Sequence, residues 1–176
     1  MRLWPYSRLN RFFLESMAKN ISSRQRTSAI SIGFGWVASM NGLGNIAVDL
    51  IKNGFRFVHA RFISEQMDEF EKNFLQQHTP CIFRDKNRII KALAEVHTEL
   101  VLIHPFRDGN GRVARLLATL MALQAGFPPL NFNVIKESKK REYIAAVHAS
   151  VVRNYDPMEK IFRWVLEKSI PRTRRA

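Results

Sequence analysis

Apolar side chains recur at helical spacing through the second half of the chain. The clearest run covers residues 86–103, where apolar positions follow one another every three or four residues: Ile89, Ile90, Leu93, Val96, Leu100 and Ile103. This spacing places them on one face of a helix. The pattern therefore predicts an amphipathic helix from about residue 86 to residue 103.

A second helical pattern, "RVARLLATLMALQAG", begins near Arg112 and is apolar nearly all round. A helix of this kind is typical of the middle of a bundle. Gly126 is a suitable C-terminal stop, and Pro128 and Pro129 prevent the helix from restarting. We expect this helix to be buried in the middle of the bundle.

Shorter helical patterns flank these two. The segment 64–77, "SEQMDEFEKNFLQQ", carries an apolar stripe, and Ser64 is suited to cap it. The segment 45–54, "NIAVDLIKNG", predicts a helix that ends at Gly54.

Two further helices are predicted near the C-terminus, at about 137–152 and 157–168. Asp156 and Pro157 suit the N-cap and the first position of the last helix. The pattern as a whole predicts an all-α bundle.

One stretch favours β-structure. Residues 24–38, "RQRTSAISIGFGWVA", mix β-branched and aromatic residues with Gly33 and Gly35, which is typical of a short hairpin or an extended flap. We therefore expect the helical bundle to carry one small β-hairpin.

Composition narrows the class of protein. A chain of 176 residues suits one domain, and its single cysteine, Cys81, excludes an internal disulfide. The start "MRLWPYSRLN" lacks the apolar region of a signal peptide, and no segment is long enough to span a membrane. We expect a cytoplasmic protein with no membrane partner, and delivery as a secreted effector stays open.

The formal net charge of +13 favours acidic partners such as nucleotides, nucleic acid or an acidic protein. Charge alone does not choose among them. Recognition motifs for DNA or RNA are not visible, so direct binding of nucleic acid is the less favoured reading.

The segment "HPFRDGNGRVAR" concentrates the candidate chemistry between the two central helices. Gly109 and Gly111 allow a turn whose N–H groups point inward, and such a turn before a helix start favours an anion. Arg112 and Arg115 are three residues apart, so both can add positive charge on one face of the first helical turn.

Asp108 and His104 complete this loop. A carboxylate beside phosphates is reasonable when Mg²⁺ lies between them. Histidine is suited to proton transfer near neutral pH. The parts predict a metal–nucleotide site with a base, although a structural turn with a helix-capping histidine explains the same residues taken singly.

The whole segment 104–115 resembles the signature of the Fic family, H-P-F-x-[D/E]-G-N-G-R-x-x-R, at every fixed position. The resemblance implies a Fic-type helical fold and a protein adenylyltransferase that moves AMP from ATP to a Tyr, Thr or Ser hydroxyl of a target protein. It also divides the chain into a basic segment at 1–23, a Fic domain at 24–168 with a flap at 24–38, and a basic tail at 169–176.

The resemblance assigns roles residue by residue. His104 would be the general base and Asp108 the ligand of Mg²⁺. The nucleotide-binding positions would be Phe106, Gly109, Asn110, Gly111, Arg112 and Arg115. The flap would dock an extended target segment through Thr27, Ser28, Ala29, Ile30, Ser31 and Ile32.

Many members of the family also carry an inhibitory helix with the pattern Ser/Thr-x-x-x-Glu-Gly/Asn. Here only Ser138 and Glu142 have the spacing, Tyr143 follows them, and we interpret them as surface residues. We therefore hypothesise a toxin-like enzyme that is held inactive by a separate small antitoxin-like protein. Transfer of another nucleotide or phosphate-containing group, and a non-catalytic basic nucleic-acid-binding module, remain as alternatives.

Overall fold

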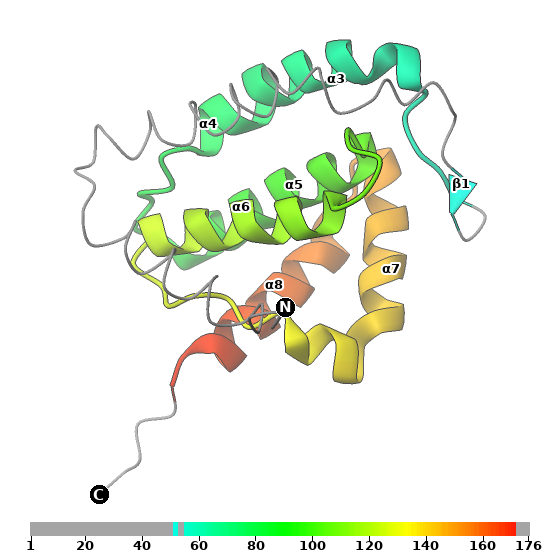
Figure 1. The fold of residues 1–176 in the computed structure, drawn as a ribbon. Coiled ribbons are helices and arrows are strands. Elements are labelled where there is room, and N and C mark those ends of the chain that lie inside the picture. Colours follow the sequence, from blue (N-terminus) through cyan, green and yellow to red (C-terminus); the bar gives the residue numbers. More distant parts are fainter. Residues whose placement is uncertain (1–50, 53–54, 172–176) are drawn as a thin grey trace, which may run out of the picture.

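The computed structural model describes residues 51–52 and 55–171. Its α-helices are α3 (Ile63–Phe70), α4 (Gln76–His78), α5 (Lys86–Ile103), α6 (Asn110–Gln124), α7 (Lys140–Ala149) and α8 (Asp156–Ser169). Two short strands, β1 (Ile51–Lys52) and β2 (Phe55–Arg56), precede them. The predicted all-α fold is confirmed. Figure 1 shows α5 and α6 side by side at the centre, with α3 and α4 along one side of them and α7 and α8 on the other.

Helix α5 forms the central element, with the bounds that the sequence pattern predicted. Asp85 caps its start, because the carboxylate accepts hydrogen bonds from the N–H groups of Asn87 and Arg88 at 3.2 and 3.1 Å. Its apolar face is fully buried, as Ile90 and Leu93 illustrate. The helix ends at Ile103, where the backbone turns into the candidate loop.

Helix α6 packs against α5 but is not buried on every side, so the prediction of an all-round interior helix is wrong. Small side chains at Ala114 and Ala118 are fully buried, which allows a close approach between helices, whereas Leu116 is 42% exposed. The helix also begins at Asn110, two residues before the predicted start. It ends near Gly126, whose φ of 84° is a left-handed conformation that suits glycine.

The segment before α5 becomes helical earlier than its sequence pattern indicated. A 3₁₀ turn at Ala60–Phe62 leads into α3, and a π-helical turn at Glu71–Leu75 joins α3 to α4. Ser64 is therefore the second residue of α3 and not its cap. The imidazole of His59 caps the 3₁₀ turn instead, accepting from the N–H of Arg61 at 3.4 Å. The apolar stripe is confirmed, since Phe70 and Phe74 are buried.

The two C-terminal helices form as predicted, with different ends. The segment predicted at 137–152 contains α7 between a π-helical turn at Ile135–Lys139 and a 3₁₀ turn at Ser150–Val152. Asp156 is the first residue of α8, and Tyr155 occupies the N-cap position. The side chain of Asn154 already accepts the N–H of Asp156 at 3.3 Å, which explains why the helix begins one residue early.

The helix predicted at 45–54 is wrong where the structure describes it. Ile51 and Lys52 form β1, which pairs antiparallel with β2 in the register Ile51↔Arg56 and Lys52↔Phe55. The dipeptide Asn-Gly at 53–54 lies between the strands in sequence, and it favours a two-residue hairpin turn as readily as a helix end. The predicted segment 1–23 and flap 24–38 lie outside the described residues.

The helices between residues 55 and 171 are too short or too polar to cross a membrane.

Candidate functional site

His104 closes the C-terminal end of α5 in an unusual backbone conformation. Its φ and ψ are 55° and 52°, which is the left-handed region, and its N–H donates to the carbonyl of Leu100 at 3.2 Å. The ring nitrogen Nδ1 lies 3.1 Å from the carbonyl oxygen of Val101. Because a carbonyl can only accept, Nδ1 carries the hydrogen of the neutral ring. The lone pair of a neutral imidazole then resides on Nε2, which is the nitrogen that can accept a proton.

The β-hairpin reaches this histidine through Phe57, the residue after β2. The rings of Phe57 and His104 have centroids 4.0 Å apart and are tilted by 39°. This contact was not predicted from the sequence, because residues 45–54 also fit a helical pattern. The Asn-Gly dipeptide was the signal that could have placed a hairpin here.

Asn110 holds the loop closed. Its side-chain Oδ1 accepts the N–H of Phe106 at 2.8 Å, and its Nδ2 donates to the carbonyl of Phe106 at 2.5 Å. Asn110 is only 2% exposed. Its amide side chain is therefore used inside the loop, and only its backbone N–H remains for a ligand.

The start of α6 is arranged for an anion. Gly109 is the N-cap residue with a φ of 92°, a conformation that glycine adopts most easily, and no side chain caps the helix. The carbonyl of Gly109 accepts the N–H groups of Arg112 and Val113 at 2.8 and 2.9 Å. The N–H groups of Asn110 and Gly111 precede these in the first turn, so they have no acceptor within the helix. Together with the helix dipole they favour a negative group.

Two arginines extend this positive region. The guanidinium of Arg112 donates to Asp108 at 2.7 Å, and its side chain is 54% exposed. The side chain of Arg115 lies close to Gly111. A Cβ atom added at Gly111 would lie 3.1 Å from Nη1 of Arg115. Glycine at position 111 thus leaves the space that the Arg115 guanidinium uses.

Asp108 is the acidic group of the loop, and its side chain is 89% exposed. Its Oδ1 accepts the N–H of Gly109 at 2.7 Å, and its Oδ2 accepts from Arg112. The described residues contain no cluster of three His, Cys, Asp or Glu side chains that could hold a metal by themselves. Magnesium commonly takes one or two carboxylates together with phosphate oxygens and water, and a single exposed carboxylate beside an anion site fits that chemistry.

The structure thus brings together all the predicted site residues of the loop: His104, Phe106, Asp108, Gly109, Asn110, Gly111, Arg112 and Arg115. The predicted docking residues Thr27, Ser28, Ala29, Ile30, Ser31 and Ile32 lie outside the described residues. A proton acceptor beside an uncapped helix start with two guanidinium groups can bind a phosphate chain and act on an incoming hydroxyl.

Comparison with known families decides the relationship. The family model described as Fic/DOC matches residues 15–122, which include the whole loop. The chain belongs to the Fic/DOC family. The matched part of this Fic/DOC chain ends within α6, at Ala122.

Curated relatives match just under half of the chain. The protein adenylyltransferase fic-1 of Caenorhabditis briggsae is 40% identical over 80 residues, which cover 46% of this Fic/DOC chain and 15% of the relative. The protein adenylyltransferase Fic of Nematostella vectensis is 46% identical over 81 residues, covering 46% of this chain and 17% of the relative. The match thus spans less than a fifth of the length of these relatives.

A solved structure shares the fold. The N-terminal Fic domain of a cell filamentation protein from Bartonella quintana, with bound ADP, is 26% identical with a TM-score of 0.56. The match covers 66% of this chain and 54% of that one. The fold of about two thirds of this chain is therefore common to both proteins.

Proposed function

We propose that this Fic/DOC chain transfers AMP from ATP to a hydroxyl group of a target protein. The observation that carries the proposal is the hydrogen bond between His104 Nδ1 and the Val101 carbonyl, which assigns the hydrogen of the neutral ring to Nδ1 and the basic lone pair to Nε2. The uncapped start of α6 follows within a few residues, so base and anion site belong to one loop. Relatives named protein adenylyltransferase support this choice of reaction.

In the proposed reaction the hydroxyl oxygen of the target attacks the α-phosphorus of ATP. A new P–O bond forms to the target, the P–O bond between the α-phosphate and the bridging oxygen breaks, and pyrophosphate leaves with that electron pair. The hydroxyl proton passes to Nε2 of His104. General-base catalysis of this kind contributes about 10²- to 10⁴-fold to a rate.

The loop supplies the phosphate contacts. The N–H groups at the start of α6 and the guanidinium groups of Arg112 and Arg115 would neutralise the oxygens of the phosphate chain, which is the main requirement of phosphoryl-type transfer. The ADP bound in the Bartonella quintana structure supports a nucleotide as the ligand. Asp108 would hold Mg²⁺, and the bound ion would supply further charge neutralisation between the carboxylate and the phosphates.

The hairpin of β1 and β2 is our candidate for target docking in the described residues. A strand edge can add an extended peptide through main-chain hydrogen bonds. Phe57 follows β2 directly and contacts the ring of His104. The hairpin therefore lies beside the proposed general base, where the target hydroxyl would have to arrive. The sequence-based assignment of docking to Thr27–Ile32 stays a prediction.

A separate inhibitory protein remains part of the proposal. Ser138 and Glu142 are both exposed, and Glu142 pairs with Lys139 on the surface of the π-helical turn and α7. Among the described residues, the hydrogen bond of Ser138 goes to the Val134 carbonyl and the ion pair of Glu142 goes to Lys139, and neither partner belongs to the loop. We propose that a small antitoxin-like protein restrains the enzyme, and co-expression that restores growth to cells making the chain would support this.

The decisive experiment incubates the purified chain with radiolabelled ATP, Mg²⁺ and a cell lysate, and identifies labelled proteins by mass spectrometry. We expect His104→Ala to lower label transfer by about 10²- to 10⁴-fold, while ATP binding measured by calorimetry persists. His148→Ala, which alters an exposed histidine of α7, is the matched control and should retain transfer. Undiminished transfer by the His104→Ala protein would contradict the proposal.

The two alternatives give different outcomes. Labelling from GTP, CTP or UTP that exceeds labelling from ATP would favour another nucleotide as the donor. Salt-sensitive DNA binding that survives both His104→Ala and Asp108→Ala, without any label transfer, would favour a nucleic-acid-binding module.

A further inference from the structure

The imidazole of His104 meets an aromatic ring as well as a backbone carbonyl. The ring centroids of Phe57 and His104 are 4.0 Å apart, and the ring planes are tilted by 39°. Nδ1 of His104 lies 3.1 Å from the carbonyl oxygen of Val101. Two groups from different parts of the chain therefore contact the side chain of the proposed general base.

These two contacts restrain different movements of the imidazole. A single hydrogen bond fixes the place of Nδ1, but the ring can still turn about the line that joins Nδ1 to its acceptor. A flat ring packed against the imidazole opposes that turn, because turning would break the contact between the rings. His104 is the C-cap residue of α5, with φ and ψ of 55° and 52°, so the helix does not continue around its side chain. A contact from outside the helix can therefore hold the plane of the ring.

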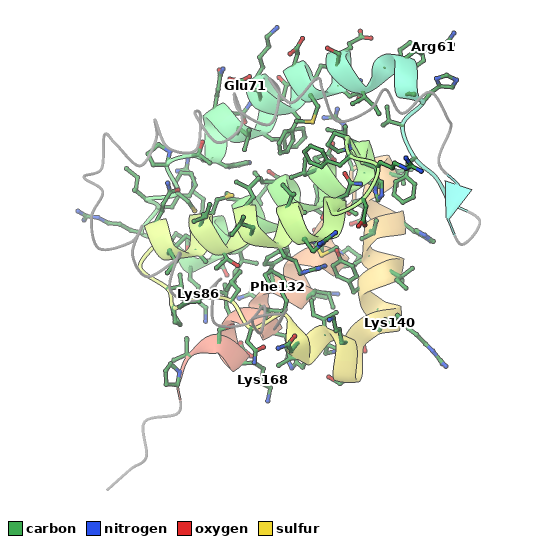
Figure 2. The ribbon with its side chains drawn as sticks, in the orientation of Figure 1. Arg61, Glu71, Lys86, Phe132, Lys140 and Lys168 are labelled. Carbon is green, nitrogen blue, oxygen red and sulfur yellow. The ribbon has the colours of Figure 1, made fainter. Side chains whose placement is uncertain are left out.

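Phe57 belongs to a short segment that is anchored at both ends. Before it, strands β1 and β2 pair antiparallel. After it, the carbonyl of His59 accepts the N–H of Phe62 at 2.9 Å in the 3₁₀ turn. Figure 2 shows Arg61, the middle residue of that turn, at the end of the bundle nearest to the strands. The segment 57–59 therefore presents the ring of Phe57 from a defined position.

We propose that Phe57 is a positioning residue for the general base. Its ring holds the plane of the His104 imidazole, so that Nδ1 keeps its hydrogen bond to Val101 and Nε2 keeps the lone pair that accepts the hydroxyl proton. The side chain of Phe57 carries no group that exchanges a proton, so it acts only through His104. This inference rests on the proposed function, because it takes His104 as the base.

The first measurement follows the tautomer of His104 by NMR, without nucleotide or target. Long-range ¹H–¹⁵N spectra of the labelled chain distinguish a ring nitrogen that carries hydrogen from one that carries a lone pair. The signals that His104→Ala removes identify this ring among the five histidines. At a pH well above the ordinary histidine pKa of about 6.5, Nδ1 of the wild type should carry the hydrogen.

Phe57→Ala should mix the two tautomers of His104, because the released ring leaves the Val101 carbonyl for part of the time. Phe57→Tyr, which keeps the flat ring, should give the spectrum of the wild type. An unchanged His104 tautomer in Phe57→Ala would overturn the inference.

The second measurement separates a displaced base from a weakened nucleotide site. Initial rates of label transfer in the lysate are measured over a series of radiolabelled ATP concentrations. Phe57→Ala should lower the maximum rate by about tenfold, which is part of the contribution of general-base catalysis, and Phe57→Tyr should retain most of it. The apparent KM for ATP should not change, because the proposed phosphate contacts come from the start of α6. A raised KM with an unchanged maximum rate would contradict the positioning role.

Phe62→Ala is the matched control, since it removes an aromatic side chain from the same part of the chain. Phe62 is 43% exposed, and its ring lies 6.2 Å from that of His59 and 4.5 Å from the guanidinium carbon of Arg61. This variant should retain the maximum rate and the His104 spectrum. Equal losses from Phe57→Ala and Phe62→Ala would contradict a specific role for Phe57. If Phe57→Ala fails to fold by circular dichroism, Phe57→Leu, which keeps apolar bulk without the flat ring, decides in its place.

The NMR readout separates this inference from the proposed reaction. A wild-type chain that labels no protein contradicts the adenylyltransferase, while the spectra still test whether Phe57 fixes the ring of His104. Normal labelling by the wild type and by Phe57→Ala, with the same tautomer in both, contradicts only the positioning role. Mixed tautomers in Phe57→Ala without any loss of rate contradict it as well, because the orientation of the ring would then not affect the reaction.

Discussion

His97 and His104 lie two turns apart on α5, yet one is enclosed by aromatic rings and the other ends the helix in a left-handed conformation. In the enclosed position burial lowers the pKa of the imidazole to about 4, so the ring stays neutral and only accepts or donates a hydrogen bond. At the helix end the backbone carbonyl of Val101 engages Nδ1 of His104 at 3.1 Å. The same side chain thus meets two different surroundings on one helix, and only His104 lies in the candidate loop.

The largest expected effect is a loss of folding stability at low pH, caused by the enclosed His97. His97 has an unfolded pKa near 6.5 and a folded pKa of about 4, so the unfolded state binds one more proton between these values. The free energy of unfolding should therefore fall as the pH drops from about 6.5 to 4, by roughly 3 kcal/mol in total, with no contribution above 6.5. Urea unfolding at several pH values measures this.

The control for the acid experiment is His97→Leu, which has no group to titrate. Glu99, whose pKa is raised mainly by burial, contributes with the opposite sign in both proteins and cancels in the difference. Identical pH dependence in the wild type and the variant would show that His97 is not enclosed as described.

The next prediction compares two glycines at the ends of α6, one inside the candidate loop and one outside it. Gly109 and Gly126 both have positive φ, at 92° and 84°, at opposite ends of α6. Replacing either with Ala should lower the free energy of unfolding by about 1 kcal/mol, because a Cβ is strained there. Only Gly109→Ala should also weaken ATP binding, by about tenfold, since it distorts the helix start that we propose as the phosphate site.

Calorimetry with ATP measures that difference. The space around Gly126 is open, with no atom within 4 Å of an added Cβ, so Gly126→Ala isolates the backbone strain. Equal ATP affinity in the two variants would mean that the start of α6 does not form the nucleotide site.

The smallest effect concerns the backbone of His104 itself. Its left-handed φ of 55° costs any residue with a Cβ, and glycine adopts the conformation more easily. His104→Gly should therefore be more stable than His104→Ala by up to about 1 kcal/mol, with transfer activity lost in both. Thermal unfolding of the two variants measures this, and a less stable glycine variant would argue against a left-handed helix end.

The sequence predicted the central helix correctly, because its signal depends on local spacing, and the roles assigned to the loop residues stay predictions. Helix α5 follows directly from apolar residues such as Ile90 and Leu93 at helical intervals. The hairpin at 51–56 was not predicted, because the apolar repeat of residues 45–54 and the Asn-Gly at its end fit a helix as well as a hairpin. Tertiary contacts decide between these two structures.

The finer parts of the site depend on contacts between elements that spacing cannot supply. The direction of the His104 ring is set by the Val101 carbonyl after the helix turns left-handed. The contacts of Phe57 with His104 and of Tyr143 with His97 join residues 47 and 46 positions apart along the chain. Sequence patterning therefore predicted the residues of the loop but not the contacts that long-range packing adds to them.

The closure of the loop by Asn110 has a consequence for the rate at which a ligand associates. Because one side-chain amide satisfies both backbone groups of Phe106, the loop is preorganised before any nucleotide arrives. A ligand then loses little affinity to ordering the protein. Association should accordingly behave as a single rapid step, without a slow rearrangement that follows the first encounter.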